Sequence, residues 1–263
     1  MEIPDSSPML HGPKLDDALD EALRLIGAAQ SEGMPMRLFG GIAVYLHVPL
    51  WSVRKGRPRK DIDFIVRRED RRGIEQLLER LGYSPDRQQN AVYGHKQLYF
   101  VDAVSGRPID VVIDQLEMCH TLELRNRLKT DDHTLPIADL VLSKLQVVKP
   151  ERKDLLDVIA LICEFPLAQD DHGINVPHIL RLLSTDWGWW RTSTGNLDQI
   201  AALIPTLSAE ELDFGRHPKY DPFEQVTALR QVIDDSPKSF KWKIRSKVGD
   251  RAVWYDEPEE VDH

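Results

Sequence analysis

The sequence predicts a mixed α/β fold, with parallel and antiparallel strands in one sheet, followed by a mainly helical C-terminal domain. Two observations carry this prediction. Up to about residue 130, short apolar runs typical of strands alternate with amphipathic helical runs, which is the pattern of a sheet flanked by helices. From Pro136 onward, apolar residues recur mostly at helical spacing. We place the boundary in the polar stretch "KTDDHT", which predicts domains over residues 1–133 and 134–263.

Each element of the first domain has its own signal. The amphipathic run at 14–30 predicts a helix that ends near Gly33. The run "MRLF" at 36–39 predicts a short strand that leads directly into Gly40-Gly41 and a helical "IAVYLH". Further along the chain we expect a basic loop at 52–60, a strand at 61–66, a helix at 69–83, and two strands at 96–103 and 108–114 joined by a Ser105-Gly106 turn.

The composition is that of an ordinary globular protein, with 41% hydrophobic and 29% charged residues in 263. No apolar run approaches the roughly 20 residues that span a bilayer, so no membrane association is expected. Cys119 and Cys163 lie in no paired motif, which favours a reducing, cytoplasmic location. The net charge of −9 argues against a surface that wraps nucleic acid, but it leaves a local basic patch open.

Two aspartates interrupt the strand-like segment "RKDIDFIV". Asp61 and Asp63 are one residue apart, so in a strand their side chains project the same way, roughly 6–7 Å from each other. Two such carboxylates repel each other unless a cation or a proton relieves them. The alternative is a strand end where the aspartates cap turns or pair with the arginines upstream.

Asp110 lies in the later strand-like run "PIDVVID", with Asp114 on the same predicted face. A third carboxylate that pointed toward Asp61 and Asp63 would complete a hard-oxygen cluster suited to Mg²⁺. Two such ions can clamp the attacking and leaving oxygens of a phosphoryl displacement. The alternative is that Asp110 only caps a strand after Pro108.

Gly40 and Gly41 stand where a strand gives way to a helix. Glycine lets the backbone approach a ligand closely, and the helix that follows presents free N–H groups to phosphate oxygens. A bare diglycine is also the ordinary sign of a tight turn. Its position one structural unit before the aspartate pair favours the phosphate interpretation.

Two predicted helices in the second domain carry charged residues of interest. Lys144 falls within the apolar stripe of "IADLVLSKLQVV", so it must snorkel, pair with an acid or reach an anionic ligand; we favour phosphate contact. On this basis, Lys144→Met is expected to preserve or raise stability and to weaken triphosphate binding. In "ERKDLLDV", Arg152 is expected on the inward edge of the helix, and Lys153 is expected to pair with Asp157.

Taken in order, "FGGIAVYLH", "RPRKDIDFIV" and "PIDVVID" resemble the polymerase-β-type nucleotidyltransferase superfamily. Within it, the chain resembles the AbiEii-like bacterial branch, through an arginine before the D-x-D pair (Arg57 or Arg59), a helix with Lys144, and "RKD" at 152–154. The resemblance covers about residues 36–165. It implies a nucleotidyltransferase-type mixed sheet.

The resemblance also implies roles for residues. Asp61, Asp63 and Asp110 would hold two Mg²⁺ ions, with Mn²⁺ as the alternative, and Gly40 and Gly41 would cradle the phosphates of a nucleoside triphosphate such as ATP. The remaining implied nucleotide-binding residues are Arg59, Lys144, Arg152 and Asp154, with Asp154 also able to orient Lys144.

The implied reaction moves a nucleotidyl group from the triphosphate to an acceptor hydroxyl, with release of pyrophosphate. Members of the resembled branch are toxins of toxin–antitoxin pairs that add nucleotides to RNA such as tRNA, so RNA and a cognate antitoxin protein are the implied partners. Two alternatives stay open: a nucleotidyltransferase that modifies small molecules such as antibiotics, and a non-catalytic protein that kept the fold for nucleotide or partner binding.

Two C-terminal segments combine aromatic and basic residues. "DWGWWR" at 186–191 favours tryptophans that anchor a helical core, with stacking on nucleobases as the alternative. "SFKWKIRSK" alternates apolar and basic residues, so we expect a basic β-hairpin over about 239–255.

Overall fold

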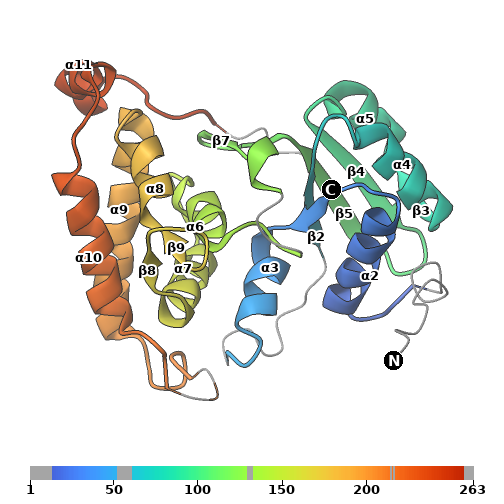
Figure 1. Cartoon of the computed structure of the whole chain (residues 1–263), viewed down its shortest axis with the longest axis horizontal. Coiled ribbons are helices and arrows are strands. Elements are labelled where there is room, and N and C mark those ends of the chain that lie inside the picture. Colours follow the sequence, from blue (N-terminus) through green and yellow to red (C-terminus); the bar gives the residue numbers. More distant parts are fainter. Residues whose placement is uncertain (1–13, 52–60, 129–132, 214, 216, 258–263) are drawn as a thin grey trace. The chain divides into compact units, whose positions relative to one another are not determined.

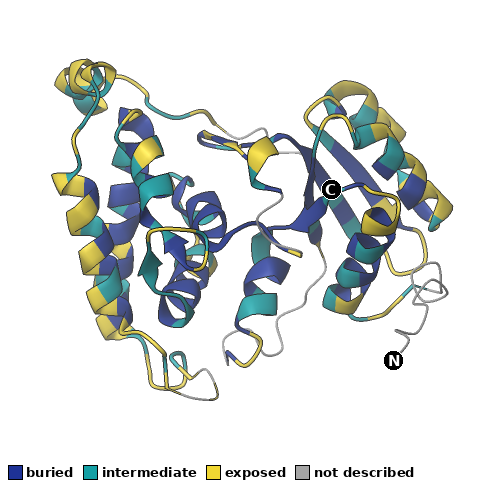
Figure 2. Ribbon diagram, viewed as in Figure 1, coloured by how far each residue is buried: buried dark blue, intermediate teal, exposed yellow. Residues whose placement is uncertain are grey.

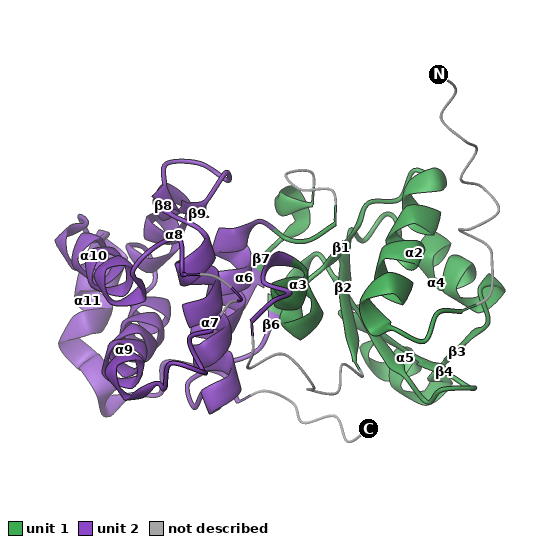
Figure 3. Cartoon of the chain, turned by 90° about the horizontal axis from the view of Figure 1, so that it is seen from below, with its two compact units in different colours: residues 1–46, 58–116, 123–135 green, residues 47–57, 117–122, 136–263 purple. Residues whose placement is uncertain are grey.

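The computed structural model describes residues 14–51, 61–128, 133–213, 215 and 217–257. The chain forms two compact units, each assembled from several segments (Figure 3). Unit 1 comprises residues 1–46, 58–116 and 123–135, and unit 2 comprises residues 47–57, 117–122 and 136–263.

Unit 1 is built on one five-stranded sheet, in the order β1-β2-β5-β4-β3 (Figure 1). The β2 and β5 strands run parallel, whereas the pairs β1–β2, β4–β5 and β3–β4 are antiparallel. The predicted mixed sheet is therefore confirmed. The strands are β1 (Met36–Leu38), β2 (Ile62–Val66), β3 (Tyr83–Pro85), β4 (Gln97–Asp102) and β5 (Pro108–Ile113).

The central strands form because their apolar side chains are buried. Ile62, Phe64 and Val66 project from one face of β2, and all three are fully buried. The central strands are coloured mainly as buried in Figure 2. The α2 and α4 helices lie on one side of the sheet and α3 lies on the other (Figure 3). The helices of unit 1 are α2 (Ala18–Ser31), α3 (Gly40–His47, with His47 already in unit 2), α4 (Arg71–Arg80) and α5 (Arg87–Tyr93).

The segment after β5 departs from the predicted strand. Asp114 adopts a left-handed conformation with φ of 63°, and its carboxylate accepts hydrogen bonds from the Arg68 backbone N–H and Nε. It therefore closes a turn and does not share a strand face with Asp110. A short hairpin follows, made of β6 (Gln115–Glu117) and β7 (Thr121–Glu123), and then a 3-10 turn at Arg125–Arg127.

Unit 2 is mainly helical, and its apolar stripes pack against one another. Trp187 and Trp189 are buried at 5% and 3% exposure, which confirms that the tryptophan cluster anchors a helical core. The helices are α6 (Ile137–Leu145), α7 (Arg152–Glu164), α8 (Val176–Leu183), α9 (Trp187–Leu203), α10 (Pro222–Asp235) and α11 (Phe240–Val248), with 3-10 turns at Ile204–Thr206 and Gly249–Arg251. Two short parallel strands, β8 (Leu167–Ala168) and β9 (Ile174–Asn175), complete the unit.

The predicted basic β-hairpin at 239–255 is wrong, because residues 240–248 form the helix α11. The Ser239 side chain caps this helix by accepting a hydrogen bond from the Trp242 backbone N–H, and Gly249 ends it with φ of 59°. The alternating pattern misled the prediction because Phe240, Ile244 and Val248 also recur at every fourth residue, which is helical spacing.

In the part of the chain that the structure describes, no helix combines the length and the apolar character needed to cross a bilayer.

Candidate functional site

Two aspartates face each other across the parallel strands at the centre of the sheet. Asp63 on β2 and Asp110 on β5 are partners in the strand register. Because register partners on adjacent strands project to the same face, the two carboxylates lie side by side. Asp63 is the one residue of β2 that is only partly buried.

Asp61 precedes the first residue of β2 and is exposed. Burial, together with the negative charge of Asp61, raises the pKa of Asp110 to about 6. The Oδ1 atom of Asp110 is buried and accepts no hydrogen bond from the described residues. Asp61 therefore acts electrostatically on Asp110, and the site carries a carboxylate whose ionised form is poorly stabilised by the protein alone.

Gly40 closes the site at the start of α3. It has a φ of 68°, and a Cβ atom built on it would lie 2.1 Å from Oδ2 of Asp63. The preceding residue, Phe39, donates its backbone N–H to the carbonyl oxygen of Asp63 at 3.0 Å. Glycine is required here for two reasons, the left-handed backbone and the contact with Asp63. Gly41 follows as the second residue of α3.

Over residues 14–51, 61–128, 133–213, 215 and 217–257, no three His, Cys, Asp or Glu side chains are grouped closely enough to hold a metal ion by themselves. Asp61, Asp63 and Asp110 thus do not form a complete cage of protein ligands. Arg59 and the other basic residues of the loop at 52–60 lie outside the described residues.

Lys144 belongs to unit 2, where it pairs with two acids. Its Nζ atom lies 2.8 Å from Oδ1 of Asp154 and 3.3 Å from Oδ2 of Asp157. Of the three options for a lysine in an apolar stripe, the structure shows pairing with acids, and Asp154 does orient Lys144. The predicted Lys153–Asp157 pair is wrong: Lys153 pairs with Glu151, because Asp157 is buried at 1% exposure and faces Lys144.

Arg152 is not on the inward edge of its helix. Its guanidinium is half exposed and pairs with Glu211 in the same unit. The helix α7 begins at Arg152, and the first turn projects away from the apolar stripe that continues from Leu156.

The raised pKa of Asp110 predicts how the free energy of unfolding depends on pH. An aspartate titrates near pH 4 in an unfolded chain, whereas Asp110 titrates near 6 in the folded protein. Between these values the folded state binds more protons, so the free energy of unfolding falls as pH rises from about 4 to about 6. Asp110→Asn is therefore expected to be more stable than the wild type by about 2 kcal/mol at pH 7.5, and no more stable near pH 4.

Urea denaturation of both proteins at the two pH values measures this difference. A stability gain of equal size at both pH values would contradict the ionisation of Asp110 as its cause.

The pairing of Lys144 reverses the stability expectation for Lys144→Met. The substitution leaves two carboxylates that have lost a charge partner, one of them buried. We expect the free energy of unfolding to fall by about 3 kcal/mol, since removing one member of a buried ion pair leaves an uncompensated charge. The matched control is Lys153→Met, which removes an exposed pair and should change stability by less than about 0.5 kcal/mol. Similar losses in the two variants, measured by thermal or urea unfolding, would argue against a structural role for the Lys144 pair.

Comparisons with known proteins add the following. The sequence profile of a family described as an uncharacterised nucleotidyltransferase matches residues 16–158, more than half of the chain. No curated protein matches the chain. Among solved structures, the chain is similar to an antigenic nucleotidyltransferase-like protein from Paracoccidioides brasiliensis, with 14% identity and a TM-score of 0.40, over 76% of this chain and 94% of that one.

Proposed function

Because this chain belongs to the family of uncharacterised nucleotidyltransferases, we propose that it transfers a nucleotidyl group from a nucleoside triphosphate to an acceptor hydroxyl and releases pyrophosphate. The observation that carries the proposal is the arrangement of Gly40 against Asp63, with Asp110 beside Asp63 on the next strand. A glycine turn and adjacent carboxylates are the parts that a phosphoryl-transfer site needs, since its catalysis consists of positioning and charge stabilisation.

The donor set fits a magnesium ion. Asp63 and Asp110 supply neighbouring carboxylate oxygens, which this ion prefers, and a buried oxygen of Asp110 lacks a hydrogen-bond partner among the described residues. Asp61 would add its negative charge from just before β2. A complete protein cage is not needed, because Mg²⁺ is usually bound by one or two carboxylates together with substrate phosphates and water. Bound there, the ion supplies charge neutralisation for the triphosphate.

Different residues of the chain would then position the triphosphate and the acceptor hydroxyl. Gly40 and Gly41 would hold the β- and γ-phosphates against the start of α3, where backbone N–H groups are free to donate. Asp61 and Asp63 would fix the triphosphate on one face of the sheet, and Asp110 would orient the acceptor hydroxyl and accept its proton. The acceptor oxygen attacks the α-phosphorus, and the bond to the pyrophosphate oxygen breaks.

For the acceptor we propose RNA, as in the toxins of the AbiEii-like branch that the motifs resemble. The support is local positive charge on a chain of net charge −9: the sequence of the loop at 52–60, and the exposed Lys241, Lys243 and Lys247 on α11. An antitoxin protein would be the partner that controls such an activity.

Incubation with each labelled nucleoside triphosphate and total RNA, with Mg²⁺ or with EDTA, tests the proposal. We expect label from one nucleotide to appear on RNA only when Mg²⁺ is present, and Mn²⁺ to substitute. Label on small molecules instead of RNA would support the alternative acceptor class. Absence of transfer with every nucleotide, together with retained nucleotide binding, would support a non-catalytic protein.

A further inference from the structure

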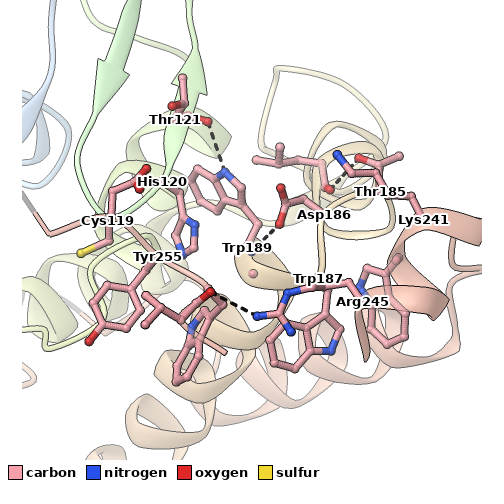
Figure 4. A pocket seen from close by; sticks show the side chains of 16 residues that line it. Cys119, His120, Thr121, Thr185, Asp186, Trp187, Trp189, Lys241, Arg245 and Tyr255 are labelled. Carbon is pink, nitrogen blue, oxygen red and sulfur yellow. Dashed lines mark hydrogen bonds between the residues drawn. The ribbon is translucent and has the colours of Figure 1, made fainter. Parts of the chain in front are cut away.

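Unit 2 contains a cavity of about 590 Å³ whose lining includes four tryptophans and a tyrosine beside charged side chains (Figure 4). It is made by parts of the chain that are distant in sequence: the turn before β7, the start of α9, the first turns of α11 and the segment after Arg251. The residues that matter for the argument are Asp186, Lys241, Trp242, Trp254 and Tyr255. None of them belongs to the aspartate site of unit 1.

The wall formed by the C-terminal segment is held in place by hydrogen bonds, although it has no regular structure. Asp256 donates its backbone N–H to the Cys119 carbonyl at 3.0 Å, and Trp254 Nε1 donates to Thr192 Oγ1 at 3.1 Å. Arg245 donates to the Ala252 carbonyl at 2.8 Å. The helix α9 carries Gly188 where this segment crosses it, and a Cβ there would lie 2.5 Å from the Trp254 carbonyl oxygen. These contacts hold the C-terminal segment in place as a wall of the cavity in unit 2.

The aromatic rings differ in what they can offer a ligand. Trp187 is buried, and the Arg245 guanidinium covers its ring at 4.5 Å from the centroid, so it belongs to the core. Trp242, Trp254 and Tyr255 are only half buried. Tyr255 meets Trp254 edge to face, with centroids 5.3 Å apart and planes at 73°. This contact fixes the Tyr255 ring while leaving it partly open, which suits stacking by a flat aromatic ligand.

Two charged side chains at the cavity have polar atoms with no hydrogen-bond partner among the described residues. Asp186 caps α9 by accepting the Trp189 backbone N–H on Oδ1 at 3.1 Å, and its Oδ2 accepts no hydrogen bond from the part of the chain that the structure describes. The exposed Lys241 ammonium makes no hydrogen bond or ion pair with any described residue. The cavity therefore offers a hydrogen-bond acceptor, a cation and aromatic faces together.

We propose that this cavity binds neighbouring nucleobases of a single-stranded RNA acceptor; the inference rests on the proposed function and adds to it the place where the acceptor is held. One base stacks on Tyr255 at one side of the cavity, and a neighbouring base donates an amino or imino N–H to Asp186 Oδ2 at the other side, where Lys241 contacts the adjoining phosphate (Figure 4). The volume lies within the roughly 300–1,000 Å³ of typical ligand pockets.

Binding of a fluorescent single-stranded triribonucleotide, followed by anisotropy in EDTA, tests the proposal without requiring any transfer. Tyr255→Ala is expected to raise Kd about tenfold, because base–aromatic stacking contributes that much per base. Lys241→Ala should weaken binding and reduce the slope of log K against log salt by about 0.7, the contribution of one phosphate contact on a single strand. The matched control is Lys243→Ala, an exposed lysine on the same helix that does not line the cavity, which should change neither quantity.

Two outcomes would overturn the proposal. Equal effects of Lys241→Ala and Lys243→Ala would indicate non-specific attraction to α11. Tighter binding of a free mononucleotide, or binding of peptides in place of the oligonucleotide, would assign the cavity to another ligand. The binding assay contains no metal, so it is independent of the transfer reaction. If the wild-type protein binds the oligonucleotide as expected but transfers no nucleotide in the Mg²⁺ assay, the proposed function is refuted and the cavity assignment stands.

Discussion

Asp63→Asn is expected to lower kcat for nucleotidyl transfer by about a thousandfold or more while the protein remains folded. Asn has nearly the same size as Asp, so the contact with Gly40 and the place of residue 63 in β2 are kept. The negative charge is lost, and with it the main electrostatic contribution of this residue to positioning the triphosphate and its ion.

The measurement is single-turnover transfer of a labelled nucleotide, with the far-UV circular dichroism and unfolding midpoint recorded for the same preparation. Asp86→Asn is the matched control, because it makes the same chemical change in unit 1 at a helix cap, where Asn can still accept the Gln89 N–H. Transfer by Asp63→Asn at the rate of the Asp86→Asn control would remove Asp63 from the reaction.

Gly40→Ala is expected to reduce both activity and stability, for separate reasons. The left-handed backbone at φ of 68° costs an alanine about 1–2 kcal/mol of stability. In addition, the new methyl group would lie 2.1 Å from Asp63 Oδ2, so this carboxylate must leave its position. Since small misplacements of a reacting group are costly, we expect kcat to fall by about a hundredfold.

Gly106→Ala separates these two effects. Gly106 has nearly the same conformation, with φ of 70°, but a Cβ there meets nothing within 4 Å. It should lose a similar amount of stability and keep its transfer activity. If both variants lose activity in proportion to their stability, the contact between Gly40 and Asp63 has no catalytic consequence.

Much of unit 1 could be predicted from the sequence because its signals are local. Strand and helix periods and the turn at Ser105-Gly106 depend on neighbouring residues only, and the predicted elements lie close to where those signals place them. Asp63 was recognisable for the same reason: an aspartate inside an otherwise apolar strand stands out without any knowledge of the fold.

Features that depend on contacts between distant residues were missed or misassigned. Phosphate contact by Lys144 stays a prediction. Its pairing with Asp157 was not foreseen, because Asp157 lies one helix further on and is buried only after α6 and α7 pack. The pattern of 240–248 is compatible with both a strand and a helix, and the cap at Ser239 and the packing of Trp242 on Trp190 stabilise the helix.

The sequence by itself determined the mixed sheet, the aspartate pair and the glycine turn before it, because each is written in a short run of residues. Only the tertiary structure decided that Asp110 lies beside Asp63, that Gly40 contacts the Asp63 carboxylate, and that an aromatic cavity exists in unit 2. The physical reason is that strand register, close backbone approach and cavity walls join segments far apart in the chain, and their energies are realised only when those segments pack.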